Sequence, residues 1–168
     1  MRAHPRIAVI GVGNEFRRDD GVGWAVVARL RTRSVREPRL SGIEPATCDG
    51  DPARLIGLWE GADLAVVIDA AHAHPSTPGR VHRLALRDAR LSAPPTTSSH
   101  GLGLGEAVEL ARVLGLLPRE LVVYAVEGAD GEFGAGLSPA VAAAVDRVAD
   151  AVEDDIARYR RSVTEVRP

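Results

Sequence analysis

Three side chains in this sequence are of types that bind divalent metals, and they are spaced along the chain so that a fold could bring them together: Asp20, Asp69 and His100. Asp69 ends a wholly apolar stretch, where a buried carboxylate requires hydrogen bonds or a cation. Asp20, like its neighbour Asp19, also suits the positive end of a helix, so a structural role explains it equally well. His100, expected near the start of a helix, is on its own more often structural or solvated. Together, two carboxylates and an imidazole favour nickel or zinc.

Two further histidines, His72 and His74, follow Asp69 in a polar segment. They could supply extra metal ligands. Loops of this kind usually run over the surface, and we therefore expect both side chains to be exposed. Whether either of them contacts a metal stays open on the residues alone.

The glycine-rich run at residues 11–14 (Gly-Val-Gly-Asn) invites a comparison with dinucleotide-binding loops. That fingerprint requires a third glycine three positions after the second, and Phe16 stands there instead. Asp19 and Asp20 would also repel a pyrophosphate at the start of the following helix. The run therefore argues against a nucleotide site.

Covalent catalysis has little support in the sequence. The single cysteine, Cys48, has acidic neighbours, which raise the pKa of a thiol and disfavour the reactive thiolate. The sequence contains neither the Gly-x-Ser-x-Gly elbow of serine hydrolases nor the His-Glu-x-x-His motif of zinc peptidases. We therefore expect Cys48 to be dispensable for chemistry.

Short apolar runs alternate with helical patterns, which predicts an α/β fold, a three-layer sandwich with a mostly parallel sheet. Strands are expected at residues 7–11, 40–47, 64–69, 80–86 and 121–126, and helices at 20–32, 51–59, 103–114 and 139 to about 160. The run at 64–69 is almost continuously apolar, which indicates a central strand covered on both faces. Asp51 and Ser138, each followed by proline, are expected to cap helices. Residues 87–99, rich in Pro, Ser and Thr, predict a long surface loop.

In folds of this class, ligands bind beyond the carboxyl ends of the strands. That edge of the sheet is expected to gather polar residues that follow separate strands: Asn14, Asp19, Asp20, Asp69 and Glu127. We therefore expect the carboxylates of Asp20 and Asp69 and the ring of His100 to face one shared cleft.

Length and charge restrict the classes of protein further. A chain of 168 residues fits one domain over residues 1–168, with a tail expected to fray after about residue 160. The net charge of −2, without a clustered basic face, argues against a nucleic-acid partner. No apolar run approaches the roughly 20 residues of a membrane span, the N-terminus does not read as a signal peptide, and one cysteine suits a reducing compartment. We expect a cytoplasmic protein without a membrane partner.

Four motifs in order along the chain resemble those of the hydrogenase maturation proteases. The opening motif joins residues 11–14 to residues 19–23 (Asp-Asp-Gly-Val-Gly). The others are residues 67–70 (Val-Ile-Asp-Ala), 99–104 (Ser-His-Gly-Leu-Gly-Leu), and 124–128 (Tyr-Ala-Val-Glu-Gly) with 136–141 behind it. The doubled acid of the first motif is fairly specific, and the others gain weight from their order. The resemblance extends over nearly the whole chain.

This resemblance implies a fold, an activity and a site. The family has an α/β/α sandwich around a five-stranded twisted sheet, and its members remove a short C-terminal extension from the large subunit of a nickel-iron hydrogenase after nickel insertion. By motif, the metal-contacting residues correspond to Asp20, Asp69 and His100. Asp20 stands where well-known members have glutamate, one methylene longer, and we expect the carboxylate role to survive. The nickel is expected on the substrate, the hydrogenase large-subunit precursor, rather than tightly bound to the enzyme.

Two other functions stay open on the residues. The chain could be a metal-dependent peptidase with its own bound metal and another substrate. It could also be a nickel-sensing chaperone that binds the large subunit without cutting it. Which hydrogenase is served, where its tail is cut and the oligomeric state cannot be read from this sequence.

Overall fold

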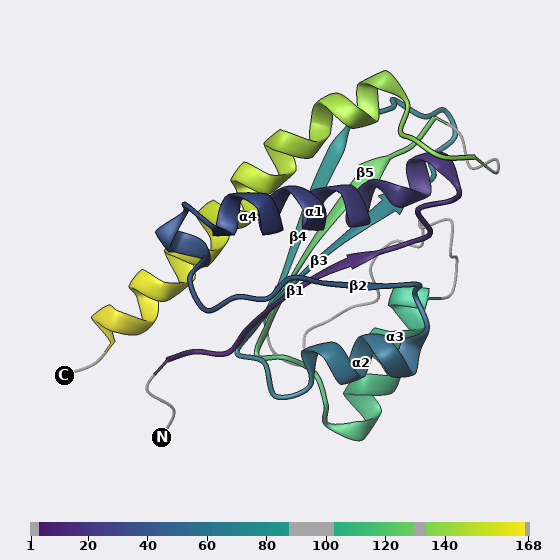
Figure 1. Cartoon of the computed structure of the whole chain (residues 1–168). Coiled ribbons are helices and arrows are strands. Elements are labelled where there is room, and N and C mark those ends of the chain that lie inside the picture. Colours follow the sequence, from purple (N-terminus) through teal and green to yellow (C-terminus); the bar gives the residue numbers. More distant parts are fainter. Residues whose placement is uncertain (1–3, 88–102, 130–133, 167–168) are drawn as a thin grey trace.

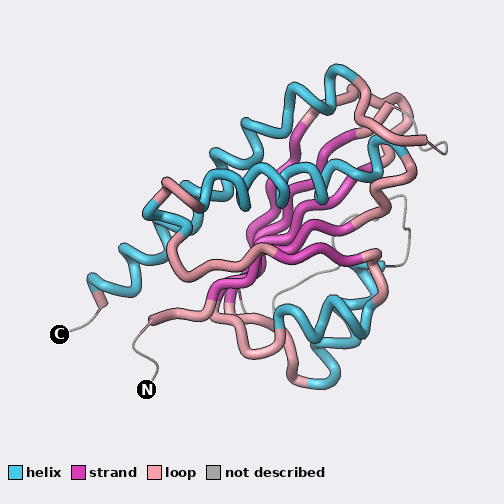
Figure 2. The backbone as a smooth tube through the Cα atoms, in the orientation of Figure 1, coloured by secondary structure: helices cyan, strands magenta, loops and turns pink. Residues whose placement is uncertain are grey.

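A five-stranded sheet between two layers of helices forms the body of the molecule (Figure 1; Figure 2). The computed structural model describes residues 4–87, 103–129 and 134–166. The strands are β1 (Ile7–Val12), β2 (Ala46–Cys48), β3 (Leu64–Ala71), β4 (Val81–Arg87) and β5 (Glu120–Glu127), in the order β2-β1-β3-β5-β4. Every neighbouring pair is parallel except β4 with β5. The predicted fold class is thereby confirmed.

Two pairs of helices cover the two faces of the sheet. Helices α1 (Val22–Ser34) and α4 (Pro139–Glu165) lie side by side on one face, and α2 (Pro52–Trp59) and α3 (Gly103–Leu114) cover the other (Figure 1). Short 3-10 helices, η1 (Arg18–Gly21) and η2 (Pro38–Leu40), precede and follow α1. Each face has its own apolar core, because alternate residues of the strands point to opposite sides.

Strand β3 lies at the centre of the sheet, between β1 and β5. All eight of its residues are buried, as the continuous apolar pattern predicts. The strand extends beyond Asp69 to Ala71, so that Asp69 lies within it and pairs in register with Ala125 of β5. A carboxylate is thus built into the most buried strand of the fold.

The predicted strand at residues 40–47 is mostly wrong. Pro38 begins η2, the Glu37 side chain accepts the Arg39 N–H as its N-cap, and Gly42 has a φ of 76°. A proline-led turn and a left-handed glycine interrupt an extended backbone, so only Ala46–Cys48 pairs with β1. By contrast, Asp51 caps α2 as predicted, since its side chain accepts the Arg54 N–H.

The first and last helices differ from the predicted bounds. Regular α-helix begins at Val22 instead of residue 20, because residues 18–21 form η1. At the other end, α4 continues past residue 160 to Glu165. Arginines of α1 pair with acids of α4 along this layer; Arg33 alone contacts Asp146, Asp150 and Glu153. These ion pairs attach the long, polar part of α4 to α1.

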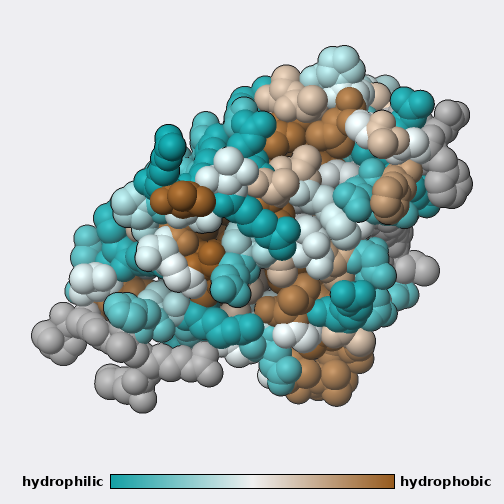
Figure 3. All heavy atoms as spheres, viewed as in Figure 1, coloured by the Kyte–Doolittle hydropathy of each residue, from teal (hydrophilic) through white to brown (hydrophobic). Residues whose placement is uncertain are grey.

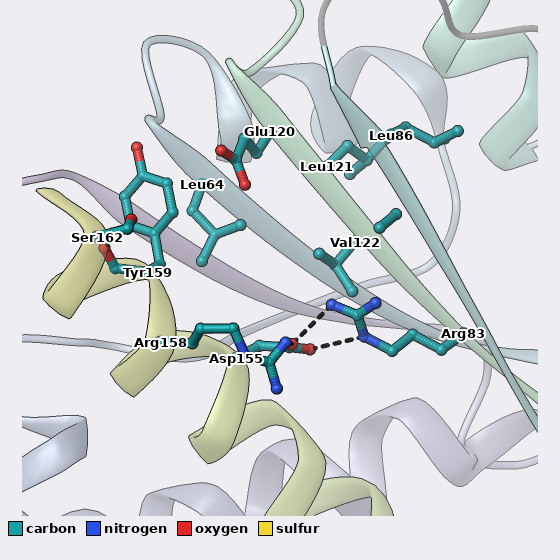
Figure 4. Close-up of a pocket in the computed structure, with 11 residues that line it drawn as sticks. Leu64, Arg83, Leu86, Glu120, Leu121, Val122, Asp155, Arg158, Tyr159 and Ser162 are labelled. Carbon is teal, nitrogen blue, oxygen red and sulfur yellow. Dashed lines mark hydrogen bonds and ion pairs between the residues drawn. The ribbon is translucent and has the colours of Figure 1, made fainter.

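A second buried carboxylate, Asp155 of α4, is fully paired. The Arg83 guanidinium binds both of its oxygens, at 2.7 and 3.2 Å, and the hydroxyl of Tyr124 donates to one of them. Arg158 of the same helix donates to it as well, at 3.1 Å. Asp155 lines a cavity of about 280 Å³ that also includes Leu64 and Glu120, the first residues of β3 and β5; Arg83 points at Asp155 across it (Figure 4). This network ties α4 to the edge of the sheet.

The surface over α1 and α4 is mainly hydrophilic, whereas apolar side chains gather at the lower edge of the view, where the end of α3 lies (Figure 3). Leu110, Val113 and Leu114 of that helix are exposed. Within the described ranges, no helix combines the length and the apolar character that crossing a bilayer requires.

Candidate metal-binding site

Asp20 is brought to the sheet by a close approach between helix and strands. It lies in η1, and only 2% of it is exposed. Gly23, at the start of α1, faces the backbone of two strands: a Cβ there would lie 2.5 Å from the carbonyl oxygen of Ile68 and 2.7 Å from that of Val12. Because no larger residue fits, this glycine allows the segment that carries Asp20 to lie over β1 and β3.

The neighbouring acid, Asp19, has a structural task. Its carboxylate accepts the N–H of Ala129 at 2.7 Å, and the N–H and hydroxyl of Ser138 at 2.7 and 2.9 Å. It thereby joins η1 to the segments after β5 and before α4. Ser138 precedes α4 as predicted, but its hydroxyl donates to Asp19 instead of capping the helix. The sequence carried no signal for this long-range link.

Hydrogen bonds with Gly134 hold the backbone around η1 in place. Arg18 adopts a left-handed φ of 47°, which is uncommon for a residue with a side chain. Its N–H donates to the carbonyl of Gly134 at 3.0 Å, and the Gly134 N–H donates to the carbonyl of Phe16 at 2.8 Å. Asn14 folds the preceding turn by accepting the Phe16 N–H. Asp20 is therefore presented by an anchored segment.

Asp69 is a buried carboxylate with one unsatisfied oxygen. Its Oδ1 accepts the N–H of Ala70 at 2.8 Å, whereas Oδ2 has no hydrogen-bond partner within the described part of the chain. Only 2% of Asp69 is exposed. The pKa of its carboxyl is raised to about 7: burial is the main cause, the hydrogen bond from Ala70 acts against it, and the charge of Asp20 adds to the rise.

Two acids therefore share one end of the sheet. That the charge of Asp20 acts on Asp69 means that the two carboxylates lie near each other. Two neighbouring buried carboxylates repel each other when both are ionised. A divalent cation between them would remove the repulsion and satisfy the free Oδ2. The pair thus fits a metal that prefers oxygen ligands and accepts an imidazole.

The two loop histidines differ. His74 is exposed, as expected. The same expectation is wrong for His72, whose side chain is 30% exposed and whose Nε2 lies 3.3 Å from Oδ1 of Asp20. The sequence placed His72 only three residues after Asp69, and a contact with a different segment could not be inferred from that spacing.

His100 lies outside the described residues, so its predicted place beside Asp20 and Asp69 stays a prediction. Among the residues that are described, no three His, Cys, Asp or Glu side chains are grouped as a metal site requires. The described part of the site therefore consists of the two carboxylates and the histidine that contacts one of them.

Glu127, expected at the same edge, anchors a loop. Its carboxylate accepts from His82 at 2.8 Å and from the Thr77 N–H at 3.2 Å, and its backbone carbonyl accepts the Gly79 N–H. The hydrogen bond from His82 is the largest cause that lowers the pKa of its carboxyl. These contacts fix the segment that leads from β3 to β4.

Cys48 is buried at the end of β2. Burial is the main cause that raises the pKa of its thiol, and Asp49 and Asp51 add to it. The direction agrees with the prediction, although the prediction rested on the acids alone. A thiol in this state is a poor nucleophile.

Comparison with known proteins places the chain in a family. The model of the family described as hydrogenase maturation protease (HycI) matches residues 49–155. The chain belongs to this family. The predicted enzyme class, a hydrogenase maturation endopeptidase, is confirmed with it.

Similar proteins and solved structures support the same family assignment. The hydrogenase 2 maturation protease of Escherichia coli (strain K12) is 29% identical over 165 residues, which are 97% of this chain and 96% of the relative. The hydrogenase expression/formation protein HupD of Thiocapsa roseopersicina is 28% identical over 91% of this chain and 67% of its own length. The structure of the hydrogenase maturating endopeptidase HybD from E. coli matches 88% of this chain and 89% of its own with a TM-score of 0.70 at 26% identity.

The fold is shared more widely than the sequence. The hydrogenase maturation protease HybD from Thermococcus kodakarensis has a TM-score of 0.72 at 23% identity and covers 89% of this chain and 97% of its own. At that identity the comparison supports the architecture alone.

Proposed function

We propose that this protease removes the C-terminal extension of a nickel-iron hydrogenase large subunit after nickel insertion, and that it recognises the nickel that the substrate carries. The observation that supports the proposal is the buried carboxylate of Asp69, with an unsatisfied oxygen and Asp20 near it. A buried carboxylate oxygen without a partner is costly unless a cation or a donor reaches it. A metal delivered by the substrate would supply that cation only in the productive complex.

In the proposed complex, Asp20 and Asp69 contact the substrate nickel through oxygen, and His100 contacts it through nitrogen. Both carboxylates must be ionised and the imidazole neutral for this to occur. The nickel would position the tail and could polarise the scissile carbonyl or activate a water. The chain contributes orientation and charge, and no side-chain nucleophile is required.

A substrate-borne metal suits this donor set better than a resident catalytic zinc. Catalytic zinc sites usually have three protein ligands, rich in His or Cys. The described residues provide two carboxylates with one histidine bound to Asp20, which would hold a free ion weakly. They could still close around a metal that a partner already anchors.

The test offers metal-stripped enzyme two forms of the precursor, one loaded with nickel and one empty, and follows the loss of the tail by mass spectrometry. Only the loaded form should be cut, and His100→Ala should abolish the cut. Efficient trimming of the empty precursor by zinc-loaded enzyme would instead favour a peptidase with its own metal. A stable complex with the loaded precursor and no cleavage would favour a nickel-sensing chaperone.

A further inference from the structure

The loop that follows β3 presents a histidine to the candidate site. His72 lies one residue after the end of β3, and its Nε2 is 3.3 Å from Oδ1 of Asp20, which belongs to η1. The contact joins the strand that carries Asp69 to the segment that carries Asp20. The family resemblance assigns no role to this position.

The loop itself is fixed, so the contact is not a chance orientation of a surface side chain. Its hydroxyl-bearing residues are bound to the end of β5: the Ser76 hydroxyl donates to the carbonyl of Gly128 at 2.8 Å, and the Thr77 N–H donates to the Glu127 carboxylate. The Gly79 N–H donates to the carbonyl of Glu127 at 2.8 Å. Three hydrogen bonds thus hold the loop against β5.

We propose that His72 is a positioning residue for Asp20: its Nε2–H donates to Oδ1 and holds the carboxylate in the orientation that serves substrate nickel. The inference rests on the proposed function, because it gives the Asp20 carboxylate a task to be positioned for. An ionised carboxylate can only accept, so the ring must carry its proton on Nε2.

His72 acts through Asp20 in this proposal and is not itself a ligand. The described residues contain no group of three metal-binding side chains, and His72, Asp20 and Asp69 do not form one. The expected loss on removing His72 is therefore partial. Removing a ligand such as Asp69 should abolish the cut instead.

The first test compares His72→Ala with His72→Gln, using His74→Ala as the matched control. A glutamine amide can place an N–H donor near the position of Nε2, whereas alanine cannot. On nickel-loaded precursor, we expect His72→Ala to lower kcat about tenfold with KM little changed, as loss of a hydrogen bond to a charged group predicts. His72→Gln should restore most of kcat, and His74→Ala, whose exposed side chain makes no hydrogen bond in the described structure, should match wild type.

The second test needs neither nickel nor precursor. Nitrogen-15 NMR of the ring in metal-free enzyme at pH 8 should show His72 protonated on Nε2 alone. Protonation on Nδ1 alone would overturn the proposal, as would a glutamine variant no better than alanine or an alanine variant equal to wild type. If wild-type enzyme cuts no loaded precursor while the Nε2–H form is observed, the proposed function fails and the contact between His72 and Asp20 stands.

Discussion

Asp69 and Asp155 are both buried carboxylates, exposed by 2% and 5%, yet their surroundings differ completely. Asp155 receives hydrogen bonds from Arg83, Arg158 and Tyr124, whereas Asp69 receives only the N–H of Ala70 within the described structure and has a second acid nearby. Asp155 faces the cavity near the starts of β3 and β5, and Asp69 lies toward the end of β3.

The difference separates two uses of a buried charge. A carboxylate with arginine and tyrosine partners fixes the position of a helix, and its hydrogen-bonding capacity is satisfied within the fold. A carboxylate without a cation weakens the fold and keeps its capacity to bind something else. Burial by itself does not identify a functional acid; the partners do.

The largest effect should follow from replacing Asp69, the acid without a cationic partner in the described structure. Asp69→Asn keeps the shape of the side chain and removes the charge, so the variant should lose at least about a thousandfold in the processing rate of nickel-loaded precursor. Its thermal unfolding midpoint should equal or exceed that of wild type, because a buried, unpaired charge disappears. Retention of more than a tenth of the rate in a folded variant would contradict the site.

The pH dependence of stability should reveal the same acid. The pKa of the Asp69 carboxyl is about 7 in the fold against an ordinary value of 3.8, so between these values the folded state keeps a proton that the unfolded state loses. Stability from this group is therefore complete below pH 4 and declines as the pH rises to 7. Asp69→Asn cannot ionise, so its unfolding free energy should rise relative to wild type across that window, by on the order of 4 kcal/mol.

The difference in unfolding free energy is measured by urea unfolding of wild type and Asp69→Asn at several pH values. Asp154→Asn, which changes an exposed acid on α4, is the control for general charge effects. Parallel curves for wild type and Asp69→Asn would show that Asp69 is ionised with a pKa near its ordinary value.

Replacing Asp155, the acid with arginine and tyrosine partners, should lower stability and leave processing almost unchanged. Asp155→Ala leaves Arg83 and Tyr124 without their shared partner, so the unfolding free energy should fall by about 3 kcal/mol. Processing of loaded precursor at a temperature where the variant is folded should stay within about twofold of wild type. A selective loss of processing in folded Asp155→Ala would remove the distinction between the two acids.

The smallest effect is expected at Cys48. Cys48→Ala removes a buried sulfur and should cost about 1 kcal/mol of stability. Processing should be unchanged, because burial and acidic neighbours raise the pKa of the thiol. Loss of cleavage by the folded variant would restore cysteine chemistry to the mechanism.

Local patterns predicted the elements that depend on local causes. Strand β3 follows from an uninterrupted apolar run, and α2 from Asp51 and Pro52 at its start. The strand expected at residues 40–47 failed because a single helix cap at Glu37 and a left-handed glycine at residue 42 outweighed the apolar residues. Short apolar runs carry too little information to resist such turns.

The site was predictable to the extent that it follows from the sheet. Asp20 and Asp69 were both expected at the carboxyl edge, and the structure brings them near each other. The anchoring of Asp19 by Ser138, and the contact of His72 with Asp20, join residues that lie far apart in sequence. Periodicity and spacing describe one segment at a time, so contacts of this kind become visible only when the segments are packed.

The strand order has a consequence for how the chain is made. In the described structure β4 pairs only with β5, and β3 also depends on β5 for one of its two neighbours. During synthesis, β3 and β4 leave the ribosome before α3 and β5 exist. Until residues 120–127 emerge, β3, which is apolar except for Asp69, has an open edge, which is a site for pairing with other chains. Sheet closure should therefore be a late step of folding, and the interval before it is the time at which this protein most needs a chaperone.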